Sequence, residues 1–432
     1  MKESKEMLRA SLKPLIPLLI GTALIIAGNA LLSTILALRG QAEGMADTFV
    51  GLWMSAYFVG YFLGSILLAG LIHEVGHIRT FSALASVASA VALLHLLLID
   101  PFVWILLRVM VGACVAGMIM VIESWLNAGA KTEIRGRVLS VYSMVTVGSW
   151  AVSQPALNLA SPEQFTLFCL VSIVLSFALV PVALARTAPP LPVAAPRMPL
   201  RKLFSVSPLG AVALPLTGTL NGAFWGLGPV YATGLGYDVS QISAVMSVTM
   251  LGGFCLQWPV GRLSDSMDRR IVIVFCAAGS VAICWLLLTL QATRFEIILA
   301  LLFGFGALTM SVYAVIIAHV NDTLDTTDVL PATGSLVLGY GLGAALGSAC
   351  AGIVTDFVGP GGLFWFCGVI ATIFATYGLA RILVQRPTLS ENKEDFLSVP
   401  RTTPIALQMD ERIPRKIVER EVVEWERDHR PD

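Results

Sequence analysis

The residues best suited to chemistry are a few charged and polar side chains that interrupt long apolar runs. Arg108 lies within one of these runs. A charge inside a membrane segment is costly enough to indicate a functional site, with snorkelling to the nearby membrane surface as the alternative. Asn29 and Asn221 lie near the centres of two other runs, where an amide should face protein or water rather than lipid. These three side chains predict a polar cavity inside an apolar protein.

Aromatic and amide side chains accompany them. Trp225 follows Asn221 by one helical turn, and Gln257 lies in the next apolar run; the other members of this set are Tyr57, Tyr61, Gln154 and Tyr313. A cavity lined by such groups suits a modest-sized organic solute better than a bare ion. Hydrogen bonding between helices is the alternative, because it is a common role of amides in membranes. The candidate substrate-binding residues are therefore Asn29, Arg108, Asn221, Trp225 and Gln257.

A charged stretch of ten residues, Gly261–Arg270, separates two apolar runs. Because its charges cannot lie in hydrocarbon, it is predicted to form a tight loop where two membrane helices turn back. Asp265 in this loop can cap a neighbouring helix and pair with Arg135 or Arg137, which begin another apolar run. These residues and Arg269 form a candidate gate; a loop that is polar only to orient its helices is the alternative.

Glu123 lies one turn from the end of the run that contains Arg108. It is interpreted as an inner gate carboxylate or a proton carrier. The alternative is a surface ion pair with Arg135 or Arg137.

The elements that hold these residues are membrane helices. Of the 432 residues, 56% are hydrophobic and 13% are charged, and the mean hydropathy is +0.81, which is outside the range of ordinary soluble domains. A span needs about 20 mostly apolar residues. Twelve segments meet this criterion: 14–38, 48–72, 80–99, 102–126, 137–160, 164–185, 209–234, 240–262, 271–291, 295–318, 330–356 and 361–384. The first run is too long for a signal-peptide core and lacks a cleavage site, so it is expected to be retained.

The positions of the basic residues predict the orientation. If both termini are cytoplasmic, all of the 28 Lys and Arg residues except Arg39, Arg108 and Arg294 lie on the cytoplasmic side. This satisfies the positive-inside rule. We therefore expect a multi-pass protein of the cell (inner) membrane.

The chain divides at a proline-rich, basic segment. We expect a cytoplasmic N-terminus (1–13), a six-helix bundle (14–185), an extended cytoplasmic linker (186–208), a second six-helix bundle (209–384) and a cytoplasmic tail (385–432). An offset of 192 residues aligns Asn29 with Asn221 and Gly60 with Gly252, as well as two further identical pairs, and superposes the first two spans on the seventh and eighth. The two bundles are thus predicted to be parallel repeats.

The tail is polar apart from a short apolar stripe, Ile417, Val418, Val422 and Trp425. It is interpreted as disordered with one marginal helix, and docking on the cytoplasmic face is the alternative.

Several of these motifs resemble a known family. Gly261–Arg270 resembles the signature loop of the major facilitator superfamily, roughly G-x-L-x-D-x-x-G-R-K, with Asp268 where the family prefers glycine. In the first half His73 replaces the expected aspartate. Arg108 and Gly112 resemble an arginine-glycine pattern of the same superfamily. The sequences Glu123-Ser124-Trp125-Leu126-Asn127 and Gln257-Trp258-Pro259-Val260-Gly261-Arg262-Leu263 are similar to its YcaD-like branch.

The resemblance implies an all-α membrane protein of twelve transmembrane helices in two pseudo-symmetric six-helix bundles. It also implies secondary transport of a small organic solute by alternating access. Expected partners are this small-molecule substrate and the lipid bilayer, with protons as the candidate coupling ion and no nucleic acid; a monomer is expected. A non-transporting receptor or scaffold acting through the charged tail is the alternative function.

Other chemistry is not expected. The chain has no G-x-x-x-x-G-K-[ST] motif, and no nucleophile constellation that would point to an enzyme. His73 and His77 are spaced like metal ligands but lack a third ligand nearby, so neither a metal nor another cofactor is predicted. The seven cysteines lie in apolar segments without a CxxC pair and are interpreted as buried hydrophobic residues.

Overall fold

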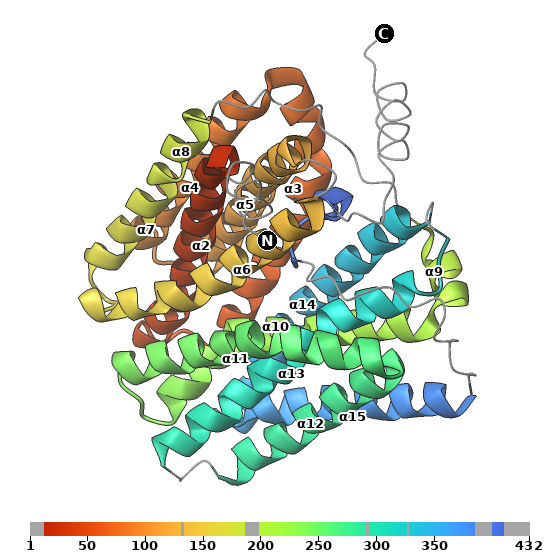
Figure 1. The fold of residues 1–432 in the computed structure, drawn as a ribbon. Coiled ribbons are helices and arrows are strands. Elements are labelled where there is room, and N and C mark those ends of the chain that lie inside the picture. Colours follow the sequence, from red (N-terminus) through yellow and green to blue (C-terminus); the bar gives the residue numbers. More distant parts are fainter. Residues whose placement is uncertain are drawn as a thin grey trace.

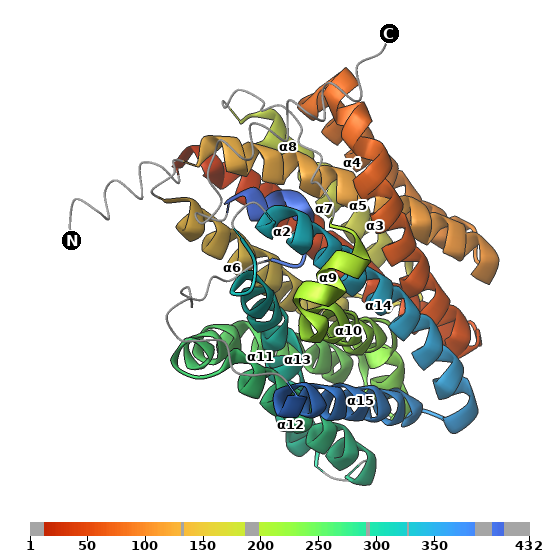
Figure 2. The ribbon, with the colours of Figure 1, turned by 90° about the vertical axis from the view of Figure 1, so that its right-hand side faces the viewer.

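The computed structural model describes residues 13–130, 134–185, 198–290, 294–325, 328–384 and 400–409, and within these ranges all regular structure is helical. The helices form two groups that lie side by side (Figures 1 and 2). The first comprises η1 (Lys13–Leu15), α2 (Ile16–Ala42), α3 (Asp47–Val75), α4 (His77–Leu97), α5 (Pro101–Gly129), α6 (Arg135–Ser153), η3 (Gln154–Leu159), α7 (Phe165–Phe177) and α8 (Leu179–Ala183). We call it the N-terminal half.

The C-terminal half repeats the arrangement. It comprises α9 (Leu200–Val206), α10 (Pro208–Gly234), α11 (Val239–Ser266), α12 (Arg269–Thr289), α13 (Phe295–Asn321), α14 (Val329–Val358) and α15 (Gly362–Val384). A last 3₁₀-helix, η5 (Pro404–Met409), packs against α5 and α6 of the N-terminal half and against α14 of the C-terminal half. The segment 400–409, which contains η5, is called the tail segment below.

If η3 is counted with α6 and α8 with α7, the helices match the expected spans with ends that differ by at most four residues. Among the described residues, ten helices are long and apolar enough to cross a membrane, and eleven if α9 and α10, which meet at 114°, count as one span. Helix α6 occupies the place of the remaining expected span but falls outside this set, since it begins with two arginines and carries five Ser and Thr residues.

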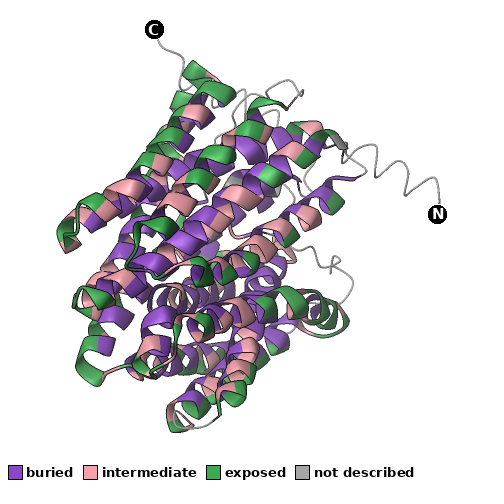
Figure 3. Ribbon diagram, turned by 90° about the vertical axis from the view of Figure 1, so that its left-hand side faces the viewer, coloured by how far each residue is buried: buried purple, intermediate pink, exposed green. Residues whose placement is uncertain are grey.

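Exposed apolar side chains cover the outside of both halves, as a bilayer requires, while buried residues concentrate where helices meet (Figure 3). Two expectations fail here. Cys255 and Cys350 are exposed, although Cys114, Cys276, Cys284 and Cys367 are buried as predicted. The linker is also not extended throughout, because residues 200–206 form α9.

The predicted loop Gly261–Arg270 is largely helical. Helix α11 continues to Ser266 and α12 begins at Arg269, so only Met267 and Asp268 form the turn. The cap of α12 is Asp268 rather than Asp265, because the Asp268 carboxylate accepts a hydrogen bond from the Arg270 N–H (3.0 Å). We call the end of the molecule that carries α9 and this turn the linker face, and the opposite end the distal face.

Glycine contacts confirm the internal repeat. A Cβ atom at Gly60 of α3 would lie 2.0 Å from the Val109 carbonyl oxygen of α5. In the other half, a Cβ at Gly252 of α11 would lie 2.0 Å from the Phe303 carbonyl oxygen of α13. Since these distances exclude any side chain, both helix pairs pack backbone against backbone at aligned positions.

Small residues on α14 serve a similar purpose. Cβ atoms at Gly343 and Gly347 would lie 2.0 and 2.2 Å from carbonyl oxygens of Pro215 and Thr219 on α10. The glycines that recur on this helix, Gly339 included, therefore allow close packing, as predicted.

Candidate functional site

The two halves are closed against each other at the distal face. The Asp356 carboxylate at the end of α14 accepts hydrogen bonds from the backbone N–H groups of Asp47 (2.8 Å) and Thr48 (2.9 Å) at the start of α3, and from the Thr48 hydroxyl. One turn further in, a Cβ on Gly51 would lie 2.3 Å from the Ser348 carbonyl oxygen. This contact leaves no room for solute to pass between α3 and α14.

Arg108 lies just beneath this closed end. Its side chain is 1% exposed, stacks on the Tyr57 ring at 4.7 Å and donates to the Ser33 hydroxyl (3.1 Å). No ion pair within the described ranges involves it. It is therefore buried in protein rather than snorkelling to the membrane surface.

Arg108 and Trp225 both line a small void between the helices. It is lined by Ser33, Leu36, Ala37, Val50, Trp53, Met54, Arg108, Trp225 and Gly226 and has a volume of about 10 Å³. That volume holds a single water molecule. In this conformation an organic solute does not fit beside Arg108.

The two asparagines occupy matching places on α2 and α10. Asn29 is 8% exposed, and its side-chain oxygen has no hydrogen-bond donor among the described residues. Asn221 is 1% exposed and donates to the Thr309 carbonyl (3.2 Å) of α13. Asn221 therefore forms a hydrogen bond between helices in this conformation, whereas Asn29 retains an unused acceptor.

A row of aromatic rings leads from Trp225 towards the linker face. Trp225 stacks on Phe58 across the two halves (centroids 6.1 Å) and meets Tyr340 edge-on (6.4 Å), which in turn contacts Tyr313 (5.0 Å). Within the described ranges, the Trp225 indole N–H and the hydroxyls of Tyr61 and Tyr313 are buried without a hydrogen-bond partner. Such unsatisfied groups are expected where a ligand supplies the missing partner.

Two predicted glutamines lie elsewhere. Gln154 is fully buried within the N-terminal half, where its side-chain oxygen accepts from the Thr34 hydroxyl (2.8 Å). Gln257 is half-buried on α11, beside the exposed Trp258. Neither residue lines the void beside Arg108.

Glu123 is a buried carboxylate on the linker-face side of the molecule. It is 0% exposed and accepts hydrogen bonds from the Tyr142 hydroxyl (2.7 Å) of α6 and from the hydroxyl and N–H of Thr403. The expected surface ion pair with Arg135 or Arg137 is therefore wrong. Tyr142 and Thr403 replace water around the carboxylate, which offsets the cost of its burial.

The tail segment reaches this site from the end of the chain. Arg401 donates to the Met310 carbonyl and lies over the Tyr313 ring at 5.2 Å, so it binds α13, while Thr403 binds Glu123 of α5. Thr403, Ile405, Ala406 and Met409 are at most 3% exposed. The tail segment thus fills the space between the halves on the linker-face side. The apolar stripe at 417–425 lies outside the described residues.

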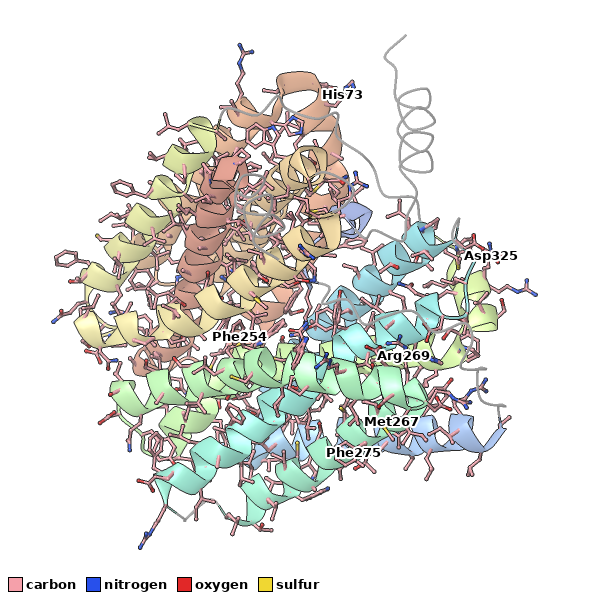
Figure 4. All side chains as sticks on the ribbon, in the orientation of Figure 1. His73, Phe254, Met267, Arg269, Phe275 and Asp325 are labelled. Atoms are coloured by element: carbon pink, nitrogen blue, oxygen red, sulfur yellow. The ribbon has the colours of Figure 1, made fainter. Side chains whose placement is uncertain are left out.

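Two of the candidate gate residues, Asp265 and Arg269, contact each other within the C-terminal half. Arg269, 1% exposed, pairs with Asp322, the residue that follows α13 (2.7 Å), and with Asp265 (3.3 Å). It lies on the linker-face side of the C-terminal half (Figure 4). Arg135 is buried and Arg137 exposed at the start of α6. A pair between Asp265 and either arginine stays a prediction. His73, which aligns with Asp265, lies in the last turn of α3 in the N-terminal half (Figure 4).

Asp268 and Arg270 form a second pair at the same end. Their side chains approach to 2.6 Å. Burial alone would raise the pKa of Asp268, but hydrogen bonds and charge from Arg270 outweigh burial and lower it.

Reasoning from sequence missed Tyr142, Arg401 and Thr403, and it considered Asp356 only as a coupling carboxylate, not as a contact between the halves. A weak signal exists for Arg401 and Thr403, because Ile405, Ala406 and Met409 interrupt an otherwise polar tail. Metal binding has no support in the described ranges, where no cluster of three or more His, Cys, Asp or Glu residues is found.

Two pseudo-symmetric helical bundles around a buried polar site define the class of two-bundle membrane transporters. The sequence profile of the Major Facilitator Superfamily matches residues 18–257 and 210–409. The chain belongs to this superfamily, whose members are secondary transporters rather than enzymes.

Relatives and solved structures agree with this assignment. An uncharacterized MFS-type transporter YcaD of Escherichia fergusonii is 26% identical over 375 residues, covering 84% of this chain and 94% of the relative. An uncharacterized MFS-type transporter of Yersinia pestis is 24% identical over 374 residues with the same coverage. The expected resemblance to the YcaD-like branch is thereby confirmed.

Three solved structures share the fold. The nucleoside transporter NupG superposes with a TM-score of 0.69 at 11% identity, covering 86% of this chain and 100% of NupG. A bacterial homologue of the human lysosomal transporter Spinster, in an inward-facing and occupied conformation, gives 0.68 at 14% identity, with 87% and 97% coverage. A D-xylose-proton symporter gives 0.63 at 13% identity, with 88% and 98% coverage.

Proposed function

We propose that this protein moves a small organic solute across the inner membrane by alternating access, and that the linker face is cytoplasmic. The observation that carries the proposal is the asymmetry between the two ends. At the distal face Asp356 and Gly51 bring α3 and α14 into backbone contact, whereas at the linker face a separate chain segment lies between the halves. This is the geometry of an inward-facing transporter.

The solute is proposed to bind between the halves, along the row of aromatic rings. Asn29 offers a free acceptor there, and Trp225, Tyr61 and Tyr313 offer buried donors without partners among the described residues. Asn221 becomes available when its bond to Thr309 opens. Arg108 is proposed to act when the distal face opens, because its surroundings admit only water in the present conformation.

Glu123 is proposed as the proton carrier. It is a fully buried carboxylate at the interface between the halves, and Tyr142 and Thr403, which donate hydrogen bonds to it, are neutral hydroxyl-bearing residues. A carboxylate without a cationic partner can gain and lose a proton as its surroundings alternate between buried and hydrated. Protonation would remove the cost of burying its charge while the halves rock.

The proposal is tested first by ligand discovery. A thermal-shift screen of the purified full chain against metabolite libraries identifies solutes that stabilise the folded state by mass action. A true substrate should lose its effect in Asn221→Ala and keep it in Asn158→Ala, a matched amide that is exposed at the distal end of η3. Solutes indifferent to both substitutions would count against the cavity.

Transport is then measured in proteoliposomes with the same solute. An imposed pH gradient should accelerate uptake by the unmodified protein. Glu123→Gln should abolish this acceleration but retain exchange across the membrane, without a gradient, of solute supplied at saturating concentration. A pH-driven rate that persists in Glu123→Gln would refute the assignment of Glu123 as proton carrier.

A further inference from the structure

The tail segment places a charged side chain where the two halves meet on the linker-face side. Arg401 places its guanidinium over the Tyr313 ring and donates to a backbone carbonyl, that of Met310. Two residues later Thr403 donates its hydroxyl and N–H to Glu123 on the opposite half. The groups that receive the tail segment are therefore a carbonyl oxygen, a tyrosine face and a carboxylate, all of which attract positive charge.

The same surroundings disfavour an anion. Glu123 is fully buried, so while it is ionised an anionic ligand beside it would meet a like charge that water does not screen. Arg108 is a buried cation near the distal face, but it lies fifteen residues before Glu123 on α5, about 22 Å along the helix axis. A small ligand at Glu123 therefore does not reach it.

We propose that the linker-face half of the cavity, formed by Glu123, Tyr142, Met310 and Tyr313, is a binding site for a compact organic cation, and that Arg401 and Thr403 compete with that cation from within the chain. This inference rests on the proposed function, because it names the substrate class of the same cavity. The guanidinium of Arg401 shows the size and charge of the group that the site accepts. Primary ammonium groups satisfy the same acceptors.

Competition between the tail segment and the cation also controls whether the halves can close on the linker face. The tail segment joins α5 of one half to α13 of the other through Thr403 and Arg401. The halves cannot close on the linker face while Ile405, Ala406 and Met409 occupy the space between them. A cation that displaces Arg401 therefore also removes the obstacle to closing, which couples substrate binding to the transport cycle.

The test uses the full chain and two small probes of nearly identical shape. N-acetyl-arginine amide carries the guanidinium, and N-acetyl-citrulline amide is its neutral counterpart. Binding of each is measured by calorimetry to the unmodified protein, to Arg401→Ala/Thr403→Val, and to the control Arg201→Ala/Ser205→Ala. The control removes the same two chemical groups from exposed positions of α9.

An attached competitor acts at an effective concentration on the order of millimolar, so its removal should strengthen binding of the arginine probe by about tenfold or more. The control should bind like the unmodified protein. The citrulline probe should bind at least about tenfold more weakly than the arginine probe, and adding Glu123→Gln to the Arg401→Ala/Thr403→Val protein should weaken the arginine probe similarly.

Two results would overturn the proposal: equal affinity of the arginine probe for the unmodified and the double-substituted protein, or equal affinity of the two probes. If the double-substituted protein does not fold, Arg401→Gln alone removes the charge with less change in packing and should strengthen the arginine probe in the same direction. A lack of cation binding together with pH-driven uptake of a different solute would refute only the cation site. Cation binding without any flux in proteoliposomes would instead refute the transport proposal.

Discussion

A single methyl group on α3 should open the distal face. The Cβ of Gly51→Ala would lie 2.3 Å from the Ser348 carbonyl oxygen and 3.1 Å from the Gly352 Cα, both on the backbone of α14. Neither atom can rotate away, so the two helices must separate by roughly 1 Å to restore ordinary contact. That displacement stretches the hydrogen bonds from Asp47 and Thr48 to the Asp356 carboxylate.

The size of the effect follows from these bonds. A hydrogen bond to a charged acceptor contributes about 1.5–3 kcal/mol, so weakening two of them by half costs about 2 kcal/mol. Because each 1.4 kcal/mol is tenfold in an equilibrium, the ratio of distal-open to distal-closed protein should rise by about thirtyfold. Gly70→Ala on the same helix is the matched control, since a Cβ there meets no heavy atom within 4 Å. Both substitutions gain the same helix propensity.

The ratio of distal-open to distal-closed protein can be measured by the rate at which a cysteine introduced at a buried position is labelled. Ala37 lines the void beside Arg108 and is 2% exposed. In a chain whose native cysteines are replaced, Ala37→Cys should react with a membrane-impermeant maleimide from the distal side much faster in Gly51→Ala than in Gly70→Ala. Equal labelling of the two proteins would refute the reasoning, because it would show that α3 and α14 need not be in backbone contact for the distal face to close.

Three further predictions concern the linker face. Arg269→Ala deprives the buried Asp322 carboxylate of its 2.7 Å partner and should destabilise the protein by about 3–5 kcal/mol, seen as a lower melting temperature than in the exposed control Arg262→Ala. Asp268 has a folded-state pKa below its ordinary value, so its contribution to stability is full above about pH 4 and is lost as pH falls through the folded-state pKa. Asp268→Asn should therefore remove this part of the acid sensitivity of the melting temperature. A melting temperature that depends on acid pH as in the unmodified protein would contradict this prediction. The charge reversal Asp265→Lys should slow transport. If Asp265 and Arg135 pair when the linker face closes, adding Arg135→Glu to the same chain should restore transport. If neither Arg135→Glu nor Arg137→Glu restores it, the predicted pairing of Asp265 with these arginines is rejected.

The helices were predictable because membrane spans are a matter of composition and length. No residue-to-residue contact is needed to place α3 or α14 to within a few positions. The repeat was predictable for a related reason, since Gly60 and Gly252 are required at aligned positions by the same backbone contact. The turn at Met267–Asp268 was not, because α11 carries its charges on a helix that extends to Ser266, and the residue that deviates from the family pattern, Asp268, became the cap.

The surroundings of Glu123 were beyond prediction for a different reason. The partner that replaces water there, Thr403, is 280 residues away in the sequence and lies in a tail whose overall composition is polar. Local patterns report which face of a helix is apolar, but not which distant segment covers a buried carboxylate. Glu123 close to a helix end therefore looked exposed, whereas in the folded chain Tyr142 and Thr403 surround it.

The glycine contacts separate what can move from what cannot. Within each half, α3 packs on α5 and α11 on α13 through aligned glycines, so each pair behaves as one rigid body. Gly51 and Gly352 make similarly close contacts, but these join α3 of one half to α14 of the other. In the proposed alternating access, the contacts between α3 and α14 across the halves must break, whereas the contacts within each half are preserved. Since the linker face has the tail segment where the distal face has glycines, the two ends do not close by the same means. In the proposed transport cycle the tail segment leaves before the distal face opens.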